Sequence, residues 1–205
     1  MHVAQAACDR QISRVRIISG IFGGRRLTSS VADSTRPTSD RVREGLASAL
    51  QARAAFEGAV VLDLFAGTGA LGLEALSRGA ARVLAVEQDR QALRCIEDNV
   101  RALQVNDRVT VLRLDLLKNP DASMERVRAA GIGPFTLVFA DPPYAQLPEF
   151  LPLLAAFALS DQCAPGALLA IEHQRSAQVP APEGLQQVGA YRYADTAVTL
   201  LAERD

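Results

Sequence analysis

Ala59-Val-Val-Leu-Asp-Leu-Phe-Ala-Gly-Thr-Gly-Ala-Leu-Gly72 is the stretch of this 205-residue chain that decides the fold. Its first six residues form a short, mostly apolar run that is typical of a buried strand. Glycines then follow with the spacing G-x-G-x-x-G, and the chain continues as an apolar helical pattern. The order strand, glycine loop, helix predicts a ligand site at the loop, because the backbone amides of a helix N-terminus are free to bind a ligand there.

Strands and helices alternate from this stretch to the C-terminus. Further strands are expected at 82–86, 109–114, 136–140 and 167–172, and helices at 70–78, 90–103, 124–130 and 149–159. A closing hairpin is expected at 186–193 and 197–202. This alternation predicts an α/β fold with a mostly parallel, doubly wound sheet and an antiparallel C-terminal hairpin. Such sheets bind ligands at the carboxyl ends of their strands.

The residues before the sheet form a basic extension. Two short strands are expected at 14–18 and 25–27, followed by a helix that starts near 37–40 and reaches about residue 55. Residues 10–43 hold eight arginines and two aspartates, a charge of +6 in a chain whose net charge is −1. We therefore divide the chain into an extension, 1–57, that contacts a polyanion, and a catalytic domain, 58–205.

The glycine loop alone allows two interpretations. Gly67, Gly69 and Gly72, with Glu87 twenty residues after Gly67, also fit a nicotinamide dinucleotide site. Asp63 argues against it, because a carboxylate next to the loop would repel a pyrophosphate. S-adenosylmethionine carries an ammonium and a sulfonium instead, and a carboxylate attracts both. The sequence therefore favours S-adenosylmethionine as the cofactor.

Residues at the next two strand ends complete the predicted donor site. Glu87 ends the second strand and is placed to accept hydrogen bonds from ribose hydroxyls. Asp115 follows the third strand and could accept the adenine amino group, with Leu116 against the ring. Phe65 belongs to the loop itself and completes the predicted cofactor-binding set.

Asp141-Pro142-Pro143-Tyr144 follows the apolar run 135–140 and predicts the chemistry. The Asp141 carboxylate and the Pro142 carbonyl could accept the two hydrogens of an exocyclic amine and favour its pyramidal form. The prolines fix the backbone that presents these acceptors. Tyr144 would stack on the base, which in a structured nucleic acid must first be splayed out. These four residues are the predicted catalytic set, and transfer to such an amine needs no metal.

Composition argues against a metal-dependent protein and against a membrane protein. The three cysteines are far apart and form no CxxC pair, and there are only two histidines, so no metal site is expected. No apolar run approaches the roughly 18 residues of a membrane helix, and the N-terminus lacks the features of a signal peptide. We expect a cytoplasmic protein without membrane partners, and a monomer.

The motifs together resemble a known family. Asp63 to Gly72 with Glu87 looks like the donor site of class I S-adenosylmethionine-dependent methyltransferases, which have a Rossmann-like fold. The segments 16–20, 24–27, 36–38, 40–44 and 65–79 are similar to the RsmD family, and the resemblance runs from about residue 14 to the C-terminus. It implies methylation of the N2 amine of a guanine in 16S ribosomal RNA, as naked RNA or in a small-subunit particle. The chain departs from the family at Ile21-Phe22, where a basic residue and a tryptophan are common.

The arginines of the extension are the predicted RNA contacts: Arg25, Arg26, Arg36, Arg41 and Arg43. Alternatives remain open at this stage. An adenine-N6 methyltransferase acting on DNA or RNA shares the Asp-Pro-Pro-Tyr turn, and a protein-glutamine methyltransferase has a related motif that usually begins with Asn. An NAD-dependent oxidoreductase shares the glycine spacing. A catalytically silent RNA-binding module would use only the basic extension.

Overall fold

The computed structural model describes residues 15–29 and 40–204. The helices are α1 (Asp40–Gln51), α2 (Ala70–Ser77), α3 (Arg90–Leu103), α4 (Pro120–Ala129), the short 3-10 helix η2 (Tyr144–Gln146) and α5 (Leu147–Ala158). The strands are β1 (Val60–Leu64), β2 (Arg82–Glu87), β3 (Val109–Arg113), β4 (Phe135–Ala140), β5 (Cys163–Gln174), β6 (Leu185–Tyr193) and β7 (Thr196–Glu203).

The seven strands form one sheet in the order β3-β2-β1-β4-β5-β7-β6. Strands β1 to β5 run parallel to one another. Strand β7 runs antiparallel to both of its neighbours, β5 and β6. The strand order reverses at β1, which pairs with β2 on one side and with β4 on the other. This reversal is the switch point at which doubly wound sheets bind ligands. The predicted α/β fold with a closing antiparallel hairpin is confirmed.

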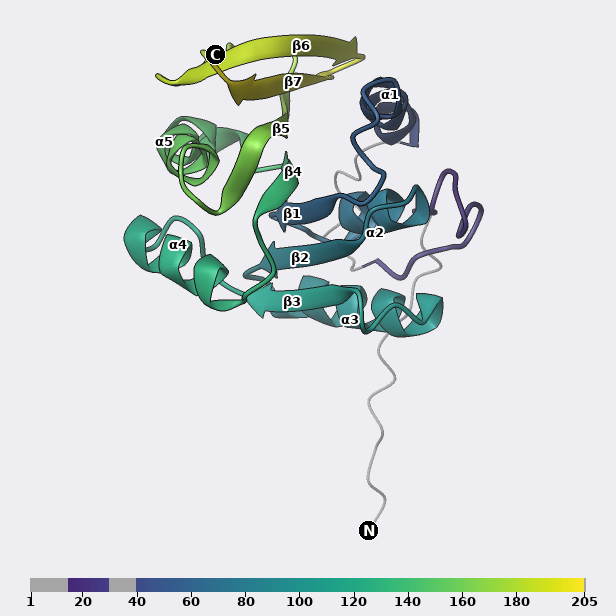
Figure 1. Cartoon of the computed structure of the whole chain (residues 1–205). Helices are drawn as coiled ribbons and strands as arrows, with labels where there is room; N and C mark the ends of the chain where they lie inside the picture. Colours follow the sequence, from purple (N-terminus) through teal and green to yellow (C-terminus); the bar gives the residue numbers. More distant parts are fainter. Residues whose placement is uncertain (1–14, 30–39, 205) are drawn as a thin grey trace.

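Helices cover both faces of the sheet (Figure 1). Helices α4 and α5 lie on the left in this view, and α1, α2 and α3 lie on the right. Each face has its own cluster of buried apolar side chains. The central strand β1 is apolar except for Asp63 and contributes to both clusters, which explains its continuous apolar sequence. Burial of a leucine such as Leu62, which is fully buried, stabilises the folded state by about 1.5–3 kcal/mol relative to an exposed side chain.

The N-terminal extension shares the core of the catalytic domain. Val15, Ile17 and Leu27, together with Leu46 and Leu50 of α1, belong to the cluster that also holds α2 and α3. Residues 15–27 form the expected hairpin, with an isolated bridge between positions 16 and 26. The boundary between residues 57 and 58 stays a prediction, and no break in packing marks it.

Two side chains of α2 hold this hairpin in place. The Glu74 carboxylate accepts hydrogen bonds from Ile18 N (2.6 Å) and Ser19 N (3.2 Å), and it also pairs with Arg78. The Ser77 hydroxyl donates to Ser19 O at 2.5 Å and accepts from Phe22 N at 2.9 Å. These backbone bonds fix the hairpin against the helix that follows the glycine loop.

Several predicted boundaries differ from the structure. Helix α4 begins at Pro120, four residues earlier than expected, because Asn119 accepts a hydrogen bond from Ala122 N and proline fits the first helical turn. Helix α1 ends at Gln51 rather than near residue 55, and Ala54 has a φ of 52°. Strand β5 begins at Cys163, four residues before the predicted start, through an irregular register with β4.

Candidate active site

The glycine loop joins β1 to α2 through backbone angles that few residues adopt. Phe65, Gly67 and Gly69 have φ values of 58°, 55° and 76°. Such values are uncommon for a residue with a side chain, and at Phe65 the ring packs edge-on against Phe150 at 5.0 Å. A Cβ at Gly72 would lie 2.8 Å from Val83 Cγ1 and 3.0 Å from Asp63 Oδ2. Glycine at position 72 therefore allows α2 to pack closely on the sheet.

The structure gives Asp63 a different position from the expected one. Its side chain is only 1% exposed, and its Oδ2 accepts a hydrogen bond from Gly72 N at 2.9 Å. The carboxyl group therefore accepts a hydrogen bond from the first turn of α2 inside the fold, and it does not lie on the surface of the loop. Burial, with smaller contributions from the charges of Asp141 and Glu87, raises the pKa of Asp63 to about 8, against the hydrogen bond from Gly72. A direct contact between Asp63 and a donor stays a prediction.

Glu87 connects the ends of β1 and β2. Its Oε2 accepts a hydrogen bond from Gly67 N at 2.9 Å, and its Oε1 accepts from Gln88 N and Asp89 N at 2.7 and 2.8 Å. Three backbone amides therefore fix the carboxylate in one orientation. Each carboxylate oxygen can accept more than one bond, so acceptor capacity remains for a ligand hydroxyl. This geometry suits the predicted contact with ribose.

The end of β3 supplies the next acidic residue. Asp115 is exposed, and its Oδ1 accepts long hydrogen bonds of 3.3 Å from Leu117 N and Lys118 N. Leu116 is 3% exposed and packs within the core cluster of α4 and α5. The apolar surface of Leu116 is therefore mostly used in that core, and its predicted contact with an adenine ring stays a prediction.

The Asp-Pro-Pro-Tyr turn lies directly beside the glycine loop. In the sheet register Leu64, the last residue of β1, is opposite Ala140, the last residue of β4, and Asp141 N donates to Leu64 O at 3.5 Å. Asp141 is half-buried, and Pro142 is buried. The Pro143 carbonyl accepts from Gln146 N at 2.7 Å, so it is already engaged.

Tyr144 begins helix η2, and its hydroxyl lies 3.4 Å from Thr196 Oγ1 on β7. The ring is half-buried. The closing antiparallel hairpin therefore contacts the aromatic residue of the turn, a link between distant segments that the local motif does not reveal.

The predicted donor residues and the predicted catalytic turn thus meet at one edge of the sheet. Leu64 is paired with Val86 of β2 on one side and with Ala140 of β4 on the other. Neighbouring strands lie about 4.8 Å apart, so the residues that follow these three strands are within reach of one small ligand. Strand order, and not sequence distance, brings Glu87 and Asp141 together.

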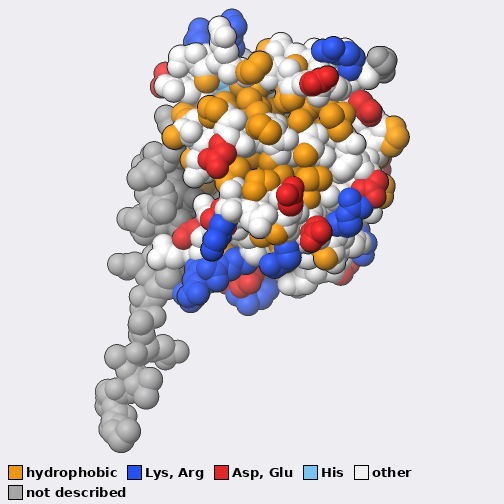
Figure 2. Space-filling view, turned by 90° about the vertical axis from the view of Figure 1, so that its left-hand side faces the viewer, with side chains coloured by type: hydrophobic (Ala, Val, Ile, Leu, Met, Phe, Trp, Pro, Cys, Tyr) orange, Lys and Arg blue, Asp and Glu red, His pale blue; other side chains and the backbone are white. Residues whose placement is uncertain are grey.

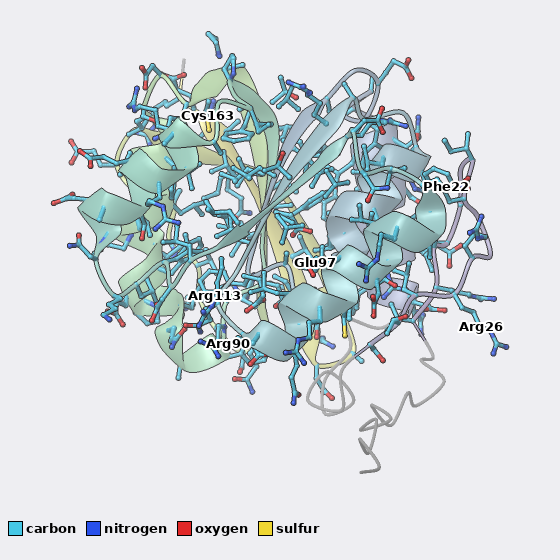
Figure 3. The ribbon with its side chains drawn as sticks, turned by 90° about the horizontal axis from the view of Figure 1, so that it is seen from below. Phe22, Arg26, Arg90, Glu97, Arg113 and Cys163 are labelled. Atoms are coloured by element: carbon cyan, nitrogen blue, oxygen red, sulfur yellow. The ribbon has the colours of Figure 1, made fainter. Side chains whose placement is uncertain are left out.

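The predicted RNA-binding arginines divide into different groups. Arg26 and Arg41 are exposed, and Figure 3 shows the Arg26 side chain directed away from the ribbon. Arg25 is also exposed, but its guanidinium donates to Ala102 O at 2.6 Å, at the end of α3. Arg36 lies outside the described residues.

Arg43 is a correction to the sequence-based prediction. Its side chain is 2% exposed and donates to Arg16 O at 2.8 Å and to Asp40 Oδ1 at 2.7 Å. Burial lowers the pKa of Arg43, while the Asp40 carboxylate opposes that shift. Arg43 therefore fastens α1 to the hairpin and cannot reach a phosphate in this conformation.

Asn99 is a site residue that the sequence reasoning missed. It is 2% exposed; its Nδ2 donates to Thr28 O and Thr68 O at 3.0 Å each, and its Oδ1 accepts from Thr28 N at 2.6 Å. Thr68 belongs to the glycine loop and Thr28 to the extension, so one amide connects the two regions. The helical period of α3 places position 99 on the same face as the buried Cys95 and Ile96, and this signal could have identified it.

Within residues 15–29 and 40–204, no group of three or more His, Cys, Asp or Glu side chains is arranged to hold a metal ion. In the same part of the chain, no helix has both the length and the apolar character needed to cross a bilayer.

Fold and site together define a class of protein. The crystal structure of an RNA methyltransferase from Salinibacter ruber, in complex with S-adenosyl-L-homocysteine, has the same fold; it is 18% identical, covers 82% of this chain and 95% of its own, and has a TM-score of 0.58. The chain thus has a Rossmann-like class I methyltransferase fold.

Closer relatives define the family. The family model described as conserved hypothetical protein 95 matches residues 15–202. The ribosomal RNA small subunit methyltransferase D of Haemophilus influenzae is 33% identical over 178 residues, 82% of this chain and 83% of that protein. The structure of a hypothetical protein from Thermus thermophilus is 31% identical, covers 93% of this chain and 99% of its own, and has a TM-score of 0.75.

The chain belongs to the ribosomal RNA small subunit methyltransferase D family. The resemblance stated from its motifs is confirmed, and so is the interpretation of the chain as a methyltransferase. The glycine spacing that also fits an oxidoreductase belongs here to a methyltransferase fold.

Proposed function

We propose that this protein transfers a methyl group from S-adenosylmethionine to the N2 amine of a guanine in 16S ribosomal RNA. One observation carries the proposal: β1 places the glycine loop and the Glu87 carboxylate directly beside the Asp141 turn. A donor site and an amine-binding turn on adjacent strand ends are what direct transfer requires. The small-subunit RNA substrate is supported by the name of the Haemophilus influenzae relative.

The charges at this edge fit a cationic donor. The negative charges of Asp141 and Glu87 both act to raise the pKa of Asp63, so the loop lies in a region of negative potential. An ammonium and a sulfonium would relieve this repulsion, whereas a pyrophosphate would add to it. A cationic donor is therefore favoured by the charges around the loop, with the Asp63 side chain itself buried beneath it.

Each residue then has a defined task. Glu87 is already oriented by three amides and would accept a ribose hydroxyl, and Asp115 would accept the adenine amino group. S-adenosylmethionine would supply an electrophilic methyl group: the amine nitrogen would bond to the methyl carbon as the sulfur–methyl bond breaks, S-adenosylhomocysteine would leave, and the amine proton would pass to Asp141 or to water. Asp141 and the Pro142 carbonyl would accept the amine hydrogens, and Tyr144 would stack on the guanine. Base stacking of this kind contributes about 1–3 kcal/mol.

Transfer of a labelled methyl group tests the proposal. Purified protein is incubated with labelled S-adenosylmethionine and either unmodified 16S RNA or small-subunit particles, and the RNA is then digested to nucleosides. Label in N2-methylguanosine supports the proposal, and comparison of the two substrates shows whether naked RNA or a particle is preferred. Label in N6-methyladenosine, or no label with either substrate, overturns it.

Calorimetry tests the donor separately. S-adenosylhomocysteine should bind with one-to-one stoichiometry, and NAD should give no heat of binding under the same conditions. Binding of NAD alone would contradict the assignment of the donor site. We further propose that the protein is cytoplasmic and acts as a monomer. Light scattering of the purified chain would check the monomeric state.

A further inference from the structure

A basic groove lies on the catalytic domain, outside the extension to which the sequence assigned RNA binding. It has a volume of about 700 Å³ and lies between the ends of β2 and β3 and the first turns of α4. Arg113, Lys118 and Arg126 line it, with Asp115 and Gln88 on the side of the predicted adenosine site. All three basic side chains are exposed.

The charge of this groove contrasts with its surroundings. Residues 44–205 hold 14 basic and 20 acidic residues, a net charge of −6. The groove has three cations and one carboxylate, a net charge of +2. Figure 2 shows basic side chains gathered along the lower edge of the face that carries α4 and α5, below a largely apolar area. A local excess of positive charge on an acidic domain indicates an anionic partner.

Internal ion pairs do not account for these cations. Among residues 15–29 and 40–204, none of the salt bridges involves Arg113, Lys118 or Arg126. Arg113 Nε makes only a long contact of 3.4 Å with Gln88 O. The Asp115 carboxylate is engaged by the amides of residues 117 and 118. By contrast Arg128, also exposed on α4, pairs with Asp161 at 2.6 Å.

The position of the groove relates it to the catalytic turn. Arg113 ends β3, three strands from β4 along the sheet, which corresponds to about 14 Å at roughly 4.8 Å per strand. A stacked nucleic-acid strand rises about 3.4 Å per nucleotide, so about four nucleotides cover this distance.

We infer that Arg113, Lys118 and Arg126 bind backbone phosphates of the RNA strand that carries the target base. The inference rests on the proposed function and adds a second RNA-contacting surface to that of the extension. Long basic side chains around an open groove suit phosphates, which position a nucleic acid without reading its sequence. RNA held here would pass over the adenosine end of the donor site on its way to Asp141.

The salt dependence of RNA binding tests this inference. Affinity for one RNA fragment is measured by anisotropy between 50 and 200 mM KCl for the wild type and for the variant Arg113→Gln/Lys118→Gln/Arg126→Gln. Each lost phosphate contact lowers the slope of log K against log salt by about 0.7–0.9. The slope of the triple variant should therefore be smaller than that of the wild type by about 2–3. From 50 to 200 mM KCl, the RNA affinity of the wild type should fall by roughly 20- to 40-fold more than that of the triple variant.

Arg128→Gln is the matched control, since it removes one exposed positive charge from the same helix but from an existing ion pair. It should leave the salt slope unchanged. The triple variant should raise the KM for RNA and leave the affinity for S-adenosylhomocysteine and kcat close to wild type. A slope equal to that of the control would overturn the inference. So would saturable binding of inorganic phosphate that the triple variant loses while its RNA slope stays that of the wild type.

This outcome is separable from that of the proposed function. If the wild-type protein methylates a guanine and the salt slope does not change in the triple variant, the groove is not an RNA surface although the function stands. If the wild type transfers no methyl group, the proposed reaction fails, whereas the salt slopes still report whether RNA occupies the groove.

Discussion

The carboxyl edge of the sheet and the N-terminal extension both carry charged residues that the sequence singled out, but they hold them differently. At the carboxyl edge, Asp63 and Glu87 are fixed by backbone amides of the very loop they accompany. In the extension, Arg43 is buried by distant segments while Arg41, two residues away, is exposed. The partners of a group bound by its own motif lie close in sequence, although Asp63 is more deeply buried than the motif indicates. A charge bound by tertiary contacts has a role that only the fold reveals.

The largest expected effect is at the turn itself. Asp141→Ala should lower kcat by about 10²- to 10³-fold, the typical loss when one polar group that stabilises a transition state is removed. Affinity for S-adenosylhomocysteine, measured by calorimetry, should stay within a few-fold of wild type, because the glycine loop and Glu87 are unchanged. Turnover equal to that of the wild type would refute the role assigned to Asp141.

Gly72→Ala tests how closely the carboxyl edge is packed. The added methyl group would meet Val83 and the Asp63 carboxylate at 2.8 and 3.0 Å, so α2 must shift. Overpacking of this kind costs about 1–3 kcal/mol of unfolding free energy, measured by urea denaturation, and should weaken donor binding as well. Stability and donor affinity that both match wild type would show that the helix and sheet can separate freely.

Arg43→Gln and Arg41→Gln sharpen the comparison within the extension. Arg43→Gln removes buried hydrogen bonds to Arg16 O and Asp40 and should lower the unfolding free energy by about 1–3 kcal/mol. Arg41→Gln should leave stability within about 0.5 kcal/mol of wild type, as is usual at exposed positions. Its effect should appear in RNA affinity. A loss of stability in Arg41→Gln together with unchanged stability in Arg43→Gln would contradict the structure.

The pH dependence of stability tests the environment of Asp63. Its folded-state pKa of about 8 lies above the unfolded value of about 3.9, so between these values the folded state holds the extra proton. Its contribution to stability is present at low pH and is lost as the pH rises toward 8, by at most about 1.4 kcal/mol per pH unit. Asp63→Asn should remove this loss, so its stability relative to wild type should grow from pH 5 to pH 8. A pH-independent difference would contradict the raised pKa.

Sequence patterns predicted the fold well where local and global preferences agree. The helix expected at 90–103 has those bounds in the structure, because Asp89 caps it and the apolar period is regular. The predicted start of α4 is four residues too late, because the helix has a weak apolar pattern and its start is set by Asn119 and Pro120. The strand order was also needed to bring Glu87 and Asp141 together, and only the tertiary pairing of strands supplies it.

The candidate site was predictable in its residues but less so in their surroundings. The glycine spacing and the Asp-Pro-Pro-Tyr turn are local, and the structure places them side by side. The burial of Leu116 and Arg43 depends on helices far along the chain, so the motif around each residue could not show it. The basic groove is not evident from the sequence, because Arg113, Lys118 and Arg126 are separated there by acidic residues and converge only in the fold.

The three hydrogen bonds of Asn99 have a consequence for protein engineering. Because Thr28 of the extension and Thr68 of the glycine loop share this one amide, the N-terminal extension is not a detachable module. A chimaera that receives residues 15–29 from another methyltransferase must also receive partners for Asn99, Glu74 and Ser77. Without them, the exchanged arm would leave buried polar groups unsatisfied beside the donor loop, and a change intended for RNA specificity would lower cofactor affinity.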